Sequence, residues 1–406
     1  MNPHKNPFSP GAGTPPPELA GRDAILTQAD LLLSRVLAGR SEKSFLAVGL
    51  RGVGKTVLLN DMQRRAESVG YRSLIVECHD GKSLAALLAP GMRQILFALD
   101  SMAAVSEKTR RGLAVLKSFL SSLKVTIADI EFGINPERGT ADSGNIEIDL
   151  PDLFVAVGEA AKDRNVGIAI LIDELQYLAP NEFSALIMAM HRMAQKSLPI
   201  VLFGAGLPQI PALAGDSKSY AERLFDFPDV GPLSDAEARR ALVEPVGKAG
   251  VNFTEESLVE IIRMTEGYPY FLQEWGYHSW NVAPMSPIDL TSVKAANELA
   301  VARLDKAFFR VRYDRLSDRE REYMRALAEL GPGVHRSGEV AKVLQGKVNE
   351  FGTVRDGLIK KGMIYSREYG SVAFTVPLFD QFMRRTMPDK PVPWNRKKKH
   401  AHPARK

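Results

Sequence analysis

Residues 49–56 have the sequence Gly49-Leu50-Arg51-Gly52-Val53-Gly54-Lys55-Thr56. These eight residues match the phosphate-binding pattern G-x-x-x-x-G-K-[ST] at every fixed position. An apolar run, residues 45–48, comes before them, and a segment with helical character follows as far as residue 65. This strand–loop–helix order directs loop N–H groups and the amino end of a helix towards an anion. The segment therefore predicts a nucleoside triphosphate site.

The pattern also assigns chemistry to the end of the loop. Lys55 is expected to reach the β- and γ-phosphates, and the Thr56 hydroxyl is expected to bind Mg²⁺. The residues predicted to contact ATP are Gly49, Leu50, Arg51, Gly52, Val53, Gly54, Lys55, Thr56 and Val57.

The composition is that of a globular protein with two or three domains. The chain has 406 residues, of which 45% are hydrophobic and 25% charged. No apolar run approaches the roughly 18 residues that cross a bilayer, and the amino end lacks the apolar region of a secretory signal. Cys78 is the only cysteine, which excludes an internal disulfide framework and a cysteine-based zinc cluster. These absences predict a cytoplasmic protein with no membrane partner.

Charge is distributed unevenly along the chain. Residues 301–406 contain 24 Lys and Arg against 12 Asp and Glu, whereas the first 300 residues contain 29 against 36. Half of the C-terminal excess lies in residues 396–406. This asymmetry favours a C-terminal part that faces a polyanion, although the tail alone is equally consistent with a solvated segment.

Alternating strand and helix patterns predict the domain order. Residues 1–17 are rich in Pro and Gly and are expected to be disordered. Residues 18–230 are predicted to form an α/β core with a parallel sheet, interrupted by an insertion at about 80–164. The insertion is expected to contain helices and a β-hairpin made of residues 124–134 and 146–150; the sequence assigns it no chemistry. A helical lid (231–290), a linker helix with a winged-helix domain (291–390) and a basic tail (391–406) follow.

The strongest predicted strand, residues 167–173, ends in Asp173-Glu174. A buried parallel strand delivers its last residues to the sheet edge where ligands bind. Asp173 is therefore predicted to hold Mg²⁺, and Glu174 to polarise the attacking water. The alternative is a helix-capping acid followed by a surface glutamate. The methionines of the next predicted helix, residues 181–195, are expected to pack in the core.

The C-terminal part shows three predicted helices followed by a β-hairpin, the order of a winged-helix domain. The third helix, residues 349–361, and the tip of the hairpin are predicted to face double-stranded DNA. The candidate contacts are Asn349, Thr353, Arg355, Lys360 and Arg367. Charges on an outer helix face that only meet solvent are the alternative.

These motifs together resemble those of AAA+ ATPases over residues 16–385. The chain is similar in particular to archaeal-type initiator ATPases, which are origin-recognition relatives, and to STAND signalling ATPases. The resemblance implies an AAA+ P-loop core, a helical lid and a C-terminal winged helix, with ATP and Mg²⁺ bound.

The same resemblance implies a slow enzyme. Such families place a polar sensor residue after the fourth strand, but residues 203–206 are Phe-Gly-Ala-Gly, expected here to form an apolar turn. The usual lid arginine is also absent, and Gly267-Tyr268-Pro269 instead resembles the Gly-x-Pro motif of STAND proteins, which implies that Pro269 packs on the nucleotide base. Arg223 occupies the place of an arginine finger, which would act in trans within a homo-oligomer; a surface salt bridge to Glu222 or Asp226 is the alternative.

Two classes of function remain after these observations. The first is an ATP-dependent switch with slow hydrolysis that positions a winged helix on DNA, and a helper ATPase of a mobile element is not distinguishable from it. The second is a STAND-type signalling or assembly ATPase whose winged helix binds protein.

Overall fold

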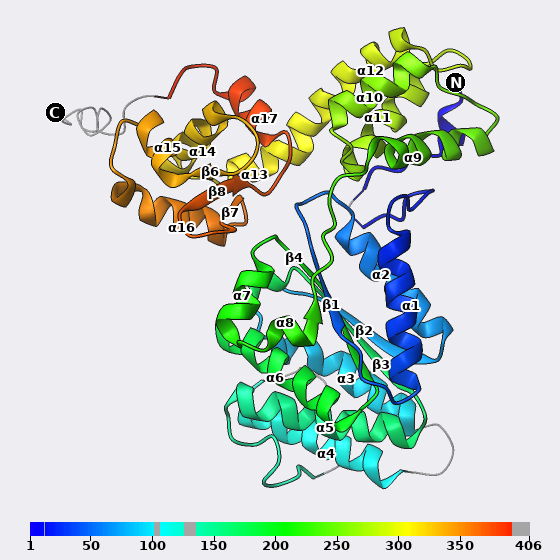
Figure 1. Cartoon of the computed structure of the whole chain (residues 1–406), viewed down its shortest axis with the longest axis vertical. Helices are drawn as coiled ribbons and strands as arrows, with labels where there is room; N and C mark the ends of the chain where they lie inside the picture. Colours follow the sequence, from blue (N-terminus) through cyan, green and yellow to red (C-terminus); the bar gives the residue numbers. More distant parts are fainter. Residues whose placement is uncertain (12, 101–105, 126–134, 392–406) are drawn as a thin grey trace, which may run out of the picture. The chain divides into compact units, whose positions relative to one another are not determined.

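The computed structural model describes residues 1–11, 13–100, 106–125 and 135–391. The chain divides into two compact units. The sheet unit comprises Arg22–Gly49 and Gly54–Val230, and the helical unit comprises Met1–Gly21, Leu50–Val53 and Gly231–Lys406. Figure 1 shows the elements in sequence colours. None of the described helices combines the length and the apolar character needed to cross a bilayer.

The sheet unit contains a five-stranded parallel sheet with the order β2-β3-β4-β1-β5. Its strands are β1 (Ser44–Val48), β2 (Tyr71–Glu77), β3 (Gly167–Asp173), β4 (Ile200–Gly206) and β5 (Phe225–Asp226). Glu77 is in register with Asp173, and Val48 with Gly206, so neighbouring strands end together. The loops that follow β1, β3 and β4 therefore meet at one sheet edge. The α/β fold with a parallel sheet is confirmed.

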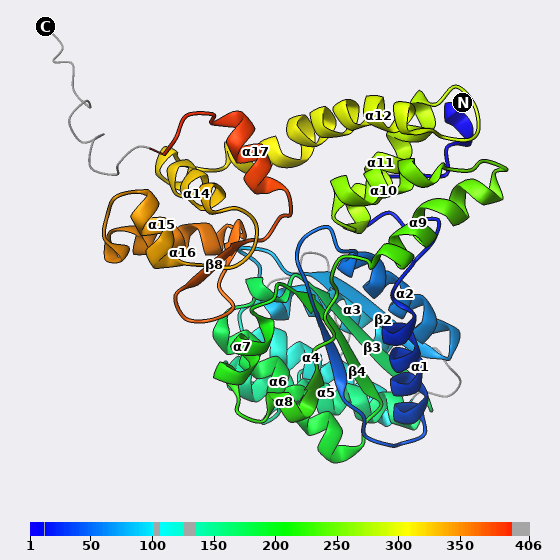
Figure 2. The same cartoon turned by 45° about the horizontal axis from the view of Figure 1, so that its top comes forward.

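Helices cover both faces of this sheet (Figure 2). Helices α1 (Asp23–Leu37) and α2 (Lys55–Ser68) pack on one face, and α3 (Leu84–Asp100), α5 (Ile146–Asp163) and α6 (Pro180–Lys196) on the other. Helix α4 (Glu107–Ser122) packs on α3 and α5. Because β3 is covered on both sides, all seven of its residues are buried, which explains its continuous apolar sequence. The short helices α7 (Ile210–Ser217) and α8 (Ala221–Leu224) follow β4.

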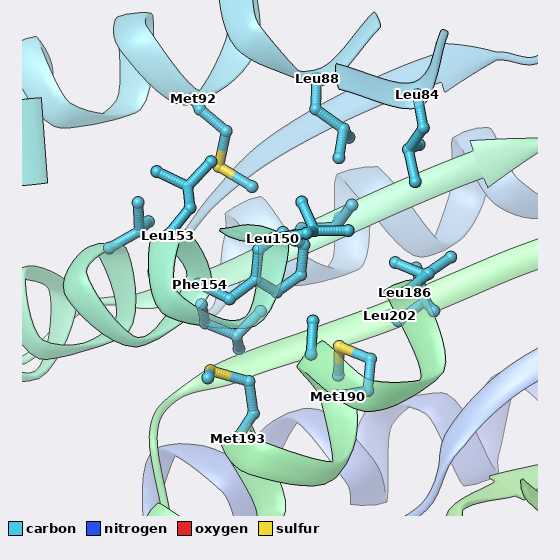
Figure 3. Packing of buried hydrophobic residues seen from close by; sticks show 14 of the residues in the cluster. Leu84, Leu88, Met92, Leu150, Leu153, Phe154, Leu186, Met190, Met193 and Leu202 are labelled. Atoms are coloured by element: carbon cyan, nitrogen blue, oxygen red, sulfur yellow. The ribbon is translucent and has the colours of Figure 1, made fainter. Parts of the chain in front are cut away.

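The core between the sheet and α3, α5 and α6 is filled by aliphatic side chains and methionines. Figure 3 shows Met190 and Met193 of α6 pointing to Phe154 of α5 and towards Leu202 of β4. Both methionines are buried, so the prediction that the methionines of this helix pack in the core is confirmed for them.

The insertion is helical where the structure describes it, and the predicted return strand at residues 146–150 is wrong. These residues form the first turns of α5. Ile146 and Leu150 are buried but Ile148 is 49% exposed, which is the spacing of a helix face and not of a strand. The side chain of Asn145 caps the helix by accepting the N–H of Glu147. Of the predicted first hairpin strand, residues 126–134 lie outside the described residues, and Lys124 and Val125 form the turn that ends α4.

The helical unit contains the helices that follow the sheet. They are α9 (Asp235–Lys248), α10 (Glu255–Thr265), α11 (Pro269–Val282) and α12 (Leu290–Arg303), which continues through a π-helical turn (Leu304–Phe309) into α13 (Arg310–Asp314). Capping boxes begin α9 at Ser234 and α14 at Ser317.

The amino-terminal segment differs from its prediction, because residues 2–9 lie on α11 in a defined conformation. The Phe8 side chain is 2% exposed and packs at Gly276, where a Cβ atom would come within 2.7 Å of its ring. Asn6 Nδ2 donates to the carbonyl of Tyr277 (3.0 Å), and Trp280 Nε1 donates to the carbonyl of Asn2 (2.9 Å). The high Pro and Gly content predicted disorder, but the buried Phe8 ring and these hydrogen bonds hold the segment on α11.

The chain ends in a small mixed domain. Helices α14 (Asp318–Leu330), α15 (Ser337–Val343) and α16 (Gly352–Lys360) precede the antiparallel strands β7 (Ile364–Tyr365) and β8 (Ser371–Phe374). The predicted helix order and hairpin of a winged helix are thus present. Two elements were not predicted: β6 (His335–Arg336), which pairs with β8, and α17 (Phe379–Thr386), which packs on α14.

Candidate functional site

The loop between β1 and α2 has the backbone that its glycines allow. Gly52 and Gly54 have φ angles of 84° and 91°, a region that side chains disfavour. The N–H of Gly49 donates to the carbonyl of Gly206 (3.1 Å), which fixes the start of the loop to the end of β4. Lys55 is the first residue of α2. The loop therefore leads directly into a helix amino end at the carboxyl edge of the sheet, as the sequence predicts.

Lys55 is buried inside the loop. The residue is only 7% exposed, and its Nζ atom donates a hydrogen bond to the carbonyl of Gly49 at 2.9 Å. A buried ammonium beside the first N–H groups of a helix makes a strong anion site. Both the ammonium and the amino end of the helix dipole are positive, so both attract an anion.

Thr56 and Asp173 meet across the sheet edge. Thr56 Oγ1 donates to Asp173 Oδ2 at 2.5 Å, and Asp173 Oδ1 accepts the N–H of Glu174 at 2.8 Å. Asp173 is 5% exposed, and this burial raises the pKa of its carboxyl above the ordinary value, an effect that the Thr56 hydrogen bond opposes. The structure thus brings together two residues that are 117 positions apart in the sequence.

The donor set fits Mg²⁺. A hydroxyl and a carboxylate are the hard oxygen ligands that this ion prefers, and Mg²⁺ commonly takes only one or two ligands from the protein beside phosphate and water. Among the described residues, no group of three or more His, Cys, Asp or Glu side chains could hold a metal by itself.

Sequence comparisons agree with this geometry. A family model described as "AAA ATPase domain" matches residues 18–203. Residues 18–203 form an AAA ATPase domain. A second model, described as a domain of unknown function (DUF8462), matches residues 306–383. No curated protein shows significant similarity to the chain.

Solved structures similar to the chain include the Walker-type ATPase PaBY2304 of Pyrococcus abyssi. It is 16% identical, with a TM-score of 0.50, and the match covers 88% of this chain and 95% of that one. Cdc6p of Pyrobaculum aerophilum (13% identity, 95% and 99% covered, TM-score 0.46) and the Aeropyrum pernix Orc1 protein in complex with DNA (14%, 92% and 94%, 0.44) also match. At 16% identity, the similarity to the Walker-type ATPase shows a shared fold.

Glu174 of the AAA ATPase domain has an unusual backbone. Its φ and ψ of 56° and 42° are left-handed, so the chain turns sharply as soon as β3 ends and enters the 3-10 turn Leu175–Tyr177. The Glu174 carboxylate accepts a hydrogen bond from Gln176 Nε2. Sequence reasoning did not select Gln176, although an amide two residues after an acidic pair was a usable signal.

The end of β4 corrects one prediction. Gly204-Ala205-Gly206 is not a turn: these residues continue the strand and are in register with Leu46, Ala47 and Val48 of β1. Strand β4 brings no polar side chain to the edge, which agrees with the absence of a sensor residue there.

The middle of the phosphate loop, Leu50–Val53, groups with the helical unit. Within that unit the N–H of Tyr270 donates to the carbonyl of Gly52 (3.2 Å), and the N–H of Arg51 donates to the carbonyl of Thr375 (2.9 Å). Pro269 is the first residue of α11, next to Tyr270. Its predicted packing on a nucleotide base remains a prediction.

Arg223 lies on α8 and is exposed. Neither predicted salt bridge is observed in the described part of the chain: Asp226 pairs with Lys43 (3.4 Å), and Glu222 forms no ion pair with Arg223. The arginine-finger role remains a prediction.

The five predicted DNA contacts all belong to the C-terminal domain. Asn349 precedes α16, Thr353, Arg355 and Lys360 lie on it, and Arg367 lies between β7 and β8. All are exposed except Arg355, which is half-buried and contacts Asp356 (3.2 Å).

Proposed function

We propose that the chain is an ATP-dependent switch, in which an AAA ATPase domain hydrolyses ATP slowly and its nucleotide state controls a winged-helix domain that binds double-stranded DNA. One observation carries the proposal: the phosphate loop is hydrogen-bonded to the C-terminal domain through Arg51 and Thr375 and to the lid through Gly52 and Tyr270. The loop predicted to bind phosphate is thus hydrogen-bonded to the lid and to the C-terminal domain, which are the parts proposed to respond to the nucleotide.

In the proposed reaction, separate residues of the site bind phosphate, hold the metal ion and orient the attacking water. The N–H groups at the start of α2 and the Lys55 ammonium hold the phosphates, and Thr56 and Asp173 would hold Mg²⁺. The metal ion neutralises phosphate charge when bound. Glu174 follows the metal ligand directly and orients the attacking water. The lack of a polar side chain on β4 supports a low rate, because β4 itself contributes no group that would orient the reacting phosphate.

Thr375 is well placed to transmit a change in the loop. It is fully buried, its N–H donates to the carbonyl of Met363 (3.1 Å), and its hydroxyl donates to the carbonyl of Gly362 (2.6 Å). Gly362 and Met363 connect α16 to β7, the two elements of the predicted DNA surface. A shift of Arg51 on nucleotide binding would therefore act on the joint between recognition helix and wing.

The experiment measures binding of a short DNA duplex to the full chain without nucleotide, with ADP and with a slowly hydrolysed ATP analogue. We expect affinity to differ by about fivefold or more between nucleotide states, the usual size of such coupling. Lys55→Ala should abolish ATP binding and with it this difference, while leaving nucleotide-free DNA binding intact. Equal affinity in all nucleotide states would refute the switch.

Salt dependence tests the DNA surface itself. Lys360→Ala and Arg367→Ala should each weaken binding and reduce the slope of log K against log salt by about 0.9, the value for one lost phosphate contact. Lys248→Ala, an exposed lysine on α9, is the matched control and should change neither.

A STAND-type signalling or assembly ATPase is the second candidate. It is favoured by the neutralisation of several basic groups of the C-terminal domain: Lys361 pairs with Glu320 (2.7 Å) and Arg336 with Glu368 (3.8 Å). Val348 and Tyr369 are also exposed there and suit a protein partner better than a phosphate backbone. Undetectable or salt-insensitive DNA binding would select this candidate.

A further inference from the structure

The carboxyl end of β4 is built from glycines because neighbouring side chains occupy the space. A Cβ atom at Gly204 would come within 2.5 Å of Leu175 Cδ1, and one at Gly206 within 2.6 Å of Ile210 Cγ1. The strand therefore cannot carry a polar side chain at either position without rearrangement of its neighbours.

Gln176 fills the place beside Gly206. Its Oε1 atom accepts the N–H of Leu207, the first residue after β4, at 3.1 Å. The same oxygen would lie 3.0 Å from a Cβ atom at Gly206, so the absence of a side chain there is what admits the amide. Although Gln176 follows β3 in the chain, its amide lies at the end of β4.

The other side of the same amide contacts Glu174. Gln176 Nε2 donates to Glu174 Oε2. The orientation of the amide follows from chemistry, because a backbone N–H can only donate and a carboxylate can only accept. Gln176 thus bridges the Glu174 carboxylate, which directly follows β3 and is predicted to activate water, and the backbone at the end of β4. A glutamine is the side chain that can donate to one and accept from the other.

The backbone of Glu174 makes the bridge possible. Its left-handed conformation is costly for a residue with a side chain, by about 1 kcal/mol or more, and such strain persists where the surroundings enforce it. The sharp turn folds Leu175 under Gly204 and returns Gln176 towards β4.

We propose that Gln176 is the polar sensor of this ATPase site, a positioning residue that acts from the turn after β3 in place of a side chain on β4. The amide, fixed by Leu207, holds the Glu174 carboxylate in one orientation towards the water that it activates. The remaining Nε2 hydrogen has no acceptor among the described residues and can respond to a phosphate oxygen. This inference rests on the proposed ATPase function and concerns the chemical step, not nucleotide binding.

The proposal predicts that hydrolysis and binding separate. Gln176→Leu removes both hydrogen bonds, and Gln176→Glu keeps the length but places a carboxylate against Glu174. In both variants we expect kcat to fall about tenfold or more, the scale of lost positioning effects, while the Kd values for ATP and ADP stay within about threefold. Affinity for ADP with aluminium fluoride, which mimics the transferring phosphoryl group, should fall by a factor similar to that of kcat.

Gln195→Leu is the matched control, because Gln195 is an exposed glutamine near the end of α6, before β4 begins. It should leave kcat and all three affinities unchanged. Thermal melting of each variant checks that it is folded, and the isosteric Gln176→Glu covers a failure of Gln176→Leu to fold. A kcat within twofold of the wild type in a folded variant overturns the proposal. The proposal is also overturned if affinity for ADP alone falls as much as affinity for ADP with aluminium fluoride, because a purely structural role would weaken both equally. Absence of hydrolysis by the wild type would overturn the proposed ATPase function and this inference together.

Discussion

The Asp173 carboxyl group is buried, and burial disfavours its charged form unless a cation lies beside it. Burial raises the pKa of Asp173 above its ordinary value of 3.8. The folded protein therefore binds this proton more tightly than the unfolded chain does. The stabilisation is complete below pH 3.8 and is lost as the pH rises through the folded-state pKa.

This gives a prediction for the protein without nucleotide. The difference in free energy of unfolding between wild type and Asp173→Asn should decrease as the pH is raised from about 4 towards 8, because only the wild type has the carboxyl to ionise. Urea unfolding at several pH values measures this difference. Addition of Mg²⁺ with ADP at pH 8 should restore stability to the wild type and much less to the variant. A pH-independent difference would show that Asp173 ionises as freely in the folded protein as in the unfolded chain.

The site residues that the sequence predicted are those whose geometry is local. Lys55 and Thr56 follow from the loop pattern, and Asp173 and Glu174 from the end of an apolar strand. For Gln176 the spacing from the acidic pair is a weaker signal, since its proposed role depends on the N–H of Leu207, 31 residues later, and on the missing side chain of Gly206. Whether these residues bind ATP and Mg²⁺ stays a prediction.

Among the elements, the junction between α10 and α11 depends on a single glycine. Gly267 has a φ of 70°, and a Cβ atom there would come within 2.3 Å of the carbonyl oxygen of Leu233. That segment is held by the N–H of Leu233, which donates to the carbonyl of Gly267 at 2.9 Å. Since the neighbouring atom belongs to the backbone, it cannot move aside as a flexible side chain would.

Gly267→Ala should therefore destabilise the protein more than the backbone conformation alone explains. Gly250 is the matched control, because its φ is 71° but no atom lies within 4 Å of a Cβ atom there. We expect a loss of about 1 kcal/mol for Gly250→Ala and about 3 kcal/mol for Gly267→Ala, measured by chemical denaturation. Equal losses would mean that Leu233 relaxes without cost.

Elements were predicted well where the pattern was long and poorly where it was short. Strand β3 has the predicted bounds, because a buried parallel strand has a continuous apolar sequence. The alternation of residues 146–150 fits a strand and a helix equally over so short a span. Asp149 resolves the ambiguity: it is fully buried, and its carboxylate accepts the N–H groups of Ser143 (3.1 Å) and Gly144 (2.9 Å), which fixes the turn that begins α5.

For the whole molecule, the sequence predicted the order of folded parts but not the contacts that join distant segments. The ties of Arg51 to Thr375 and of Gly52 to Tyr270 connect backbone atoms, and side-chain patterns carry no signal for such contacts. The same holds for the packing of Phe8 on Gly276. The two hydrogen bonds of the loop support the proposed switch, because they join Leu50–Val53 to two other segments of the helical unit.

Arg223, the predicted arginine finger, would extend this coupling beyond one molecule. It is exposed on α8, and Asp226 of the next strand pairs with Lys43. If it completes the site of a neighbouring copy, Arg223→Ala should lower kcat about tenfold or more with little change in ATP affinity, and the specific activity of the wild type should rise with protein concentration. Arg64→Ala, which removes an exposed arginine of α2, is the control and should alter neither.

Mixing two variants decides whether Arg223 acts in trans or in cis. Arg223→Ala has an intact phosphate site but no arginine to offer, and Glu174→Gln has the arginine but no water-activating group. A mixture of these two inactive variants should regain activity at the sites of the Arg223→Ala copies, and a mixture as inactive as its components would place the role of Arg223 within its own molecule.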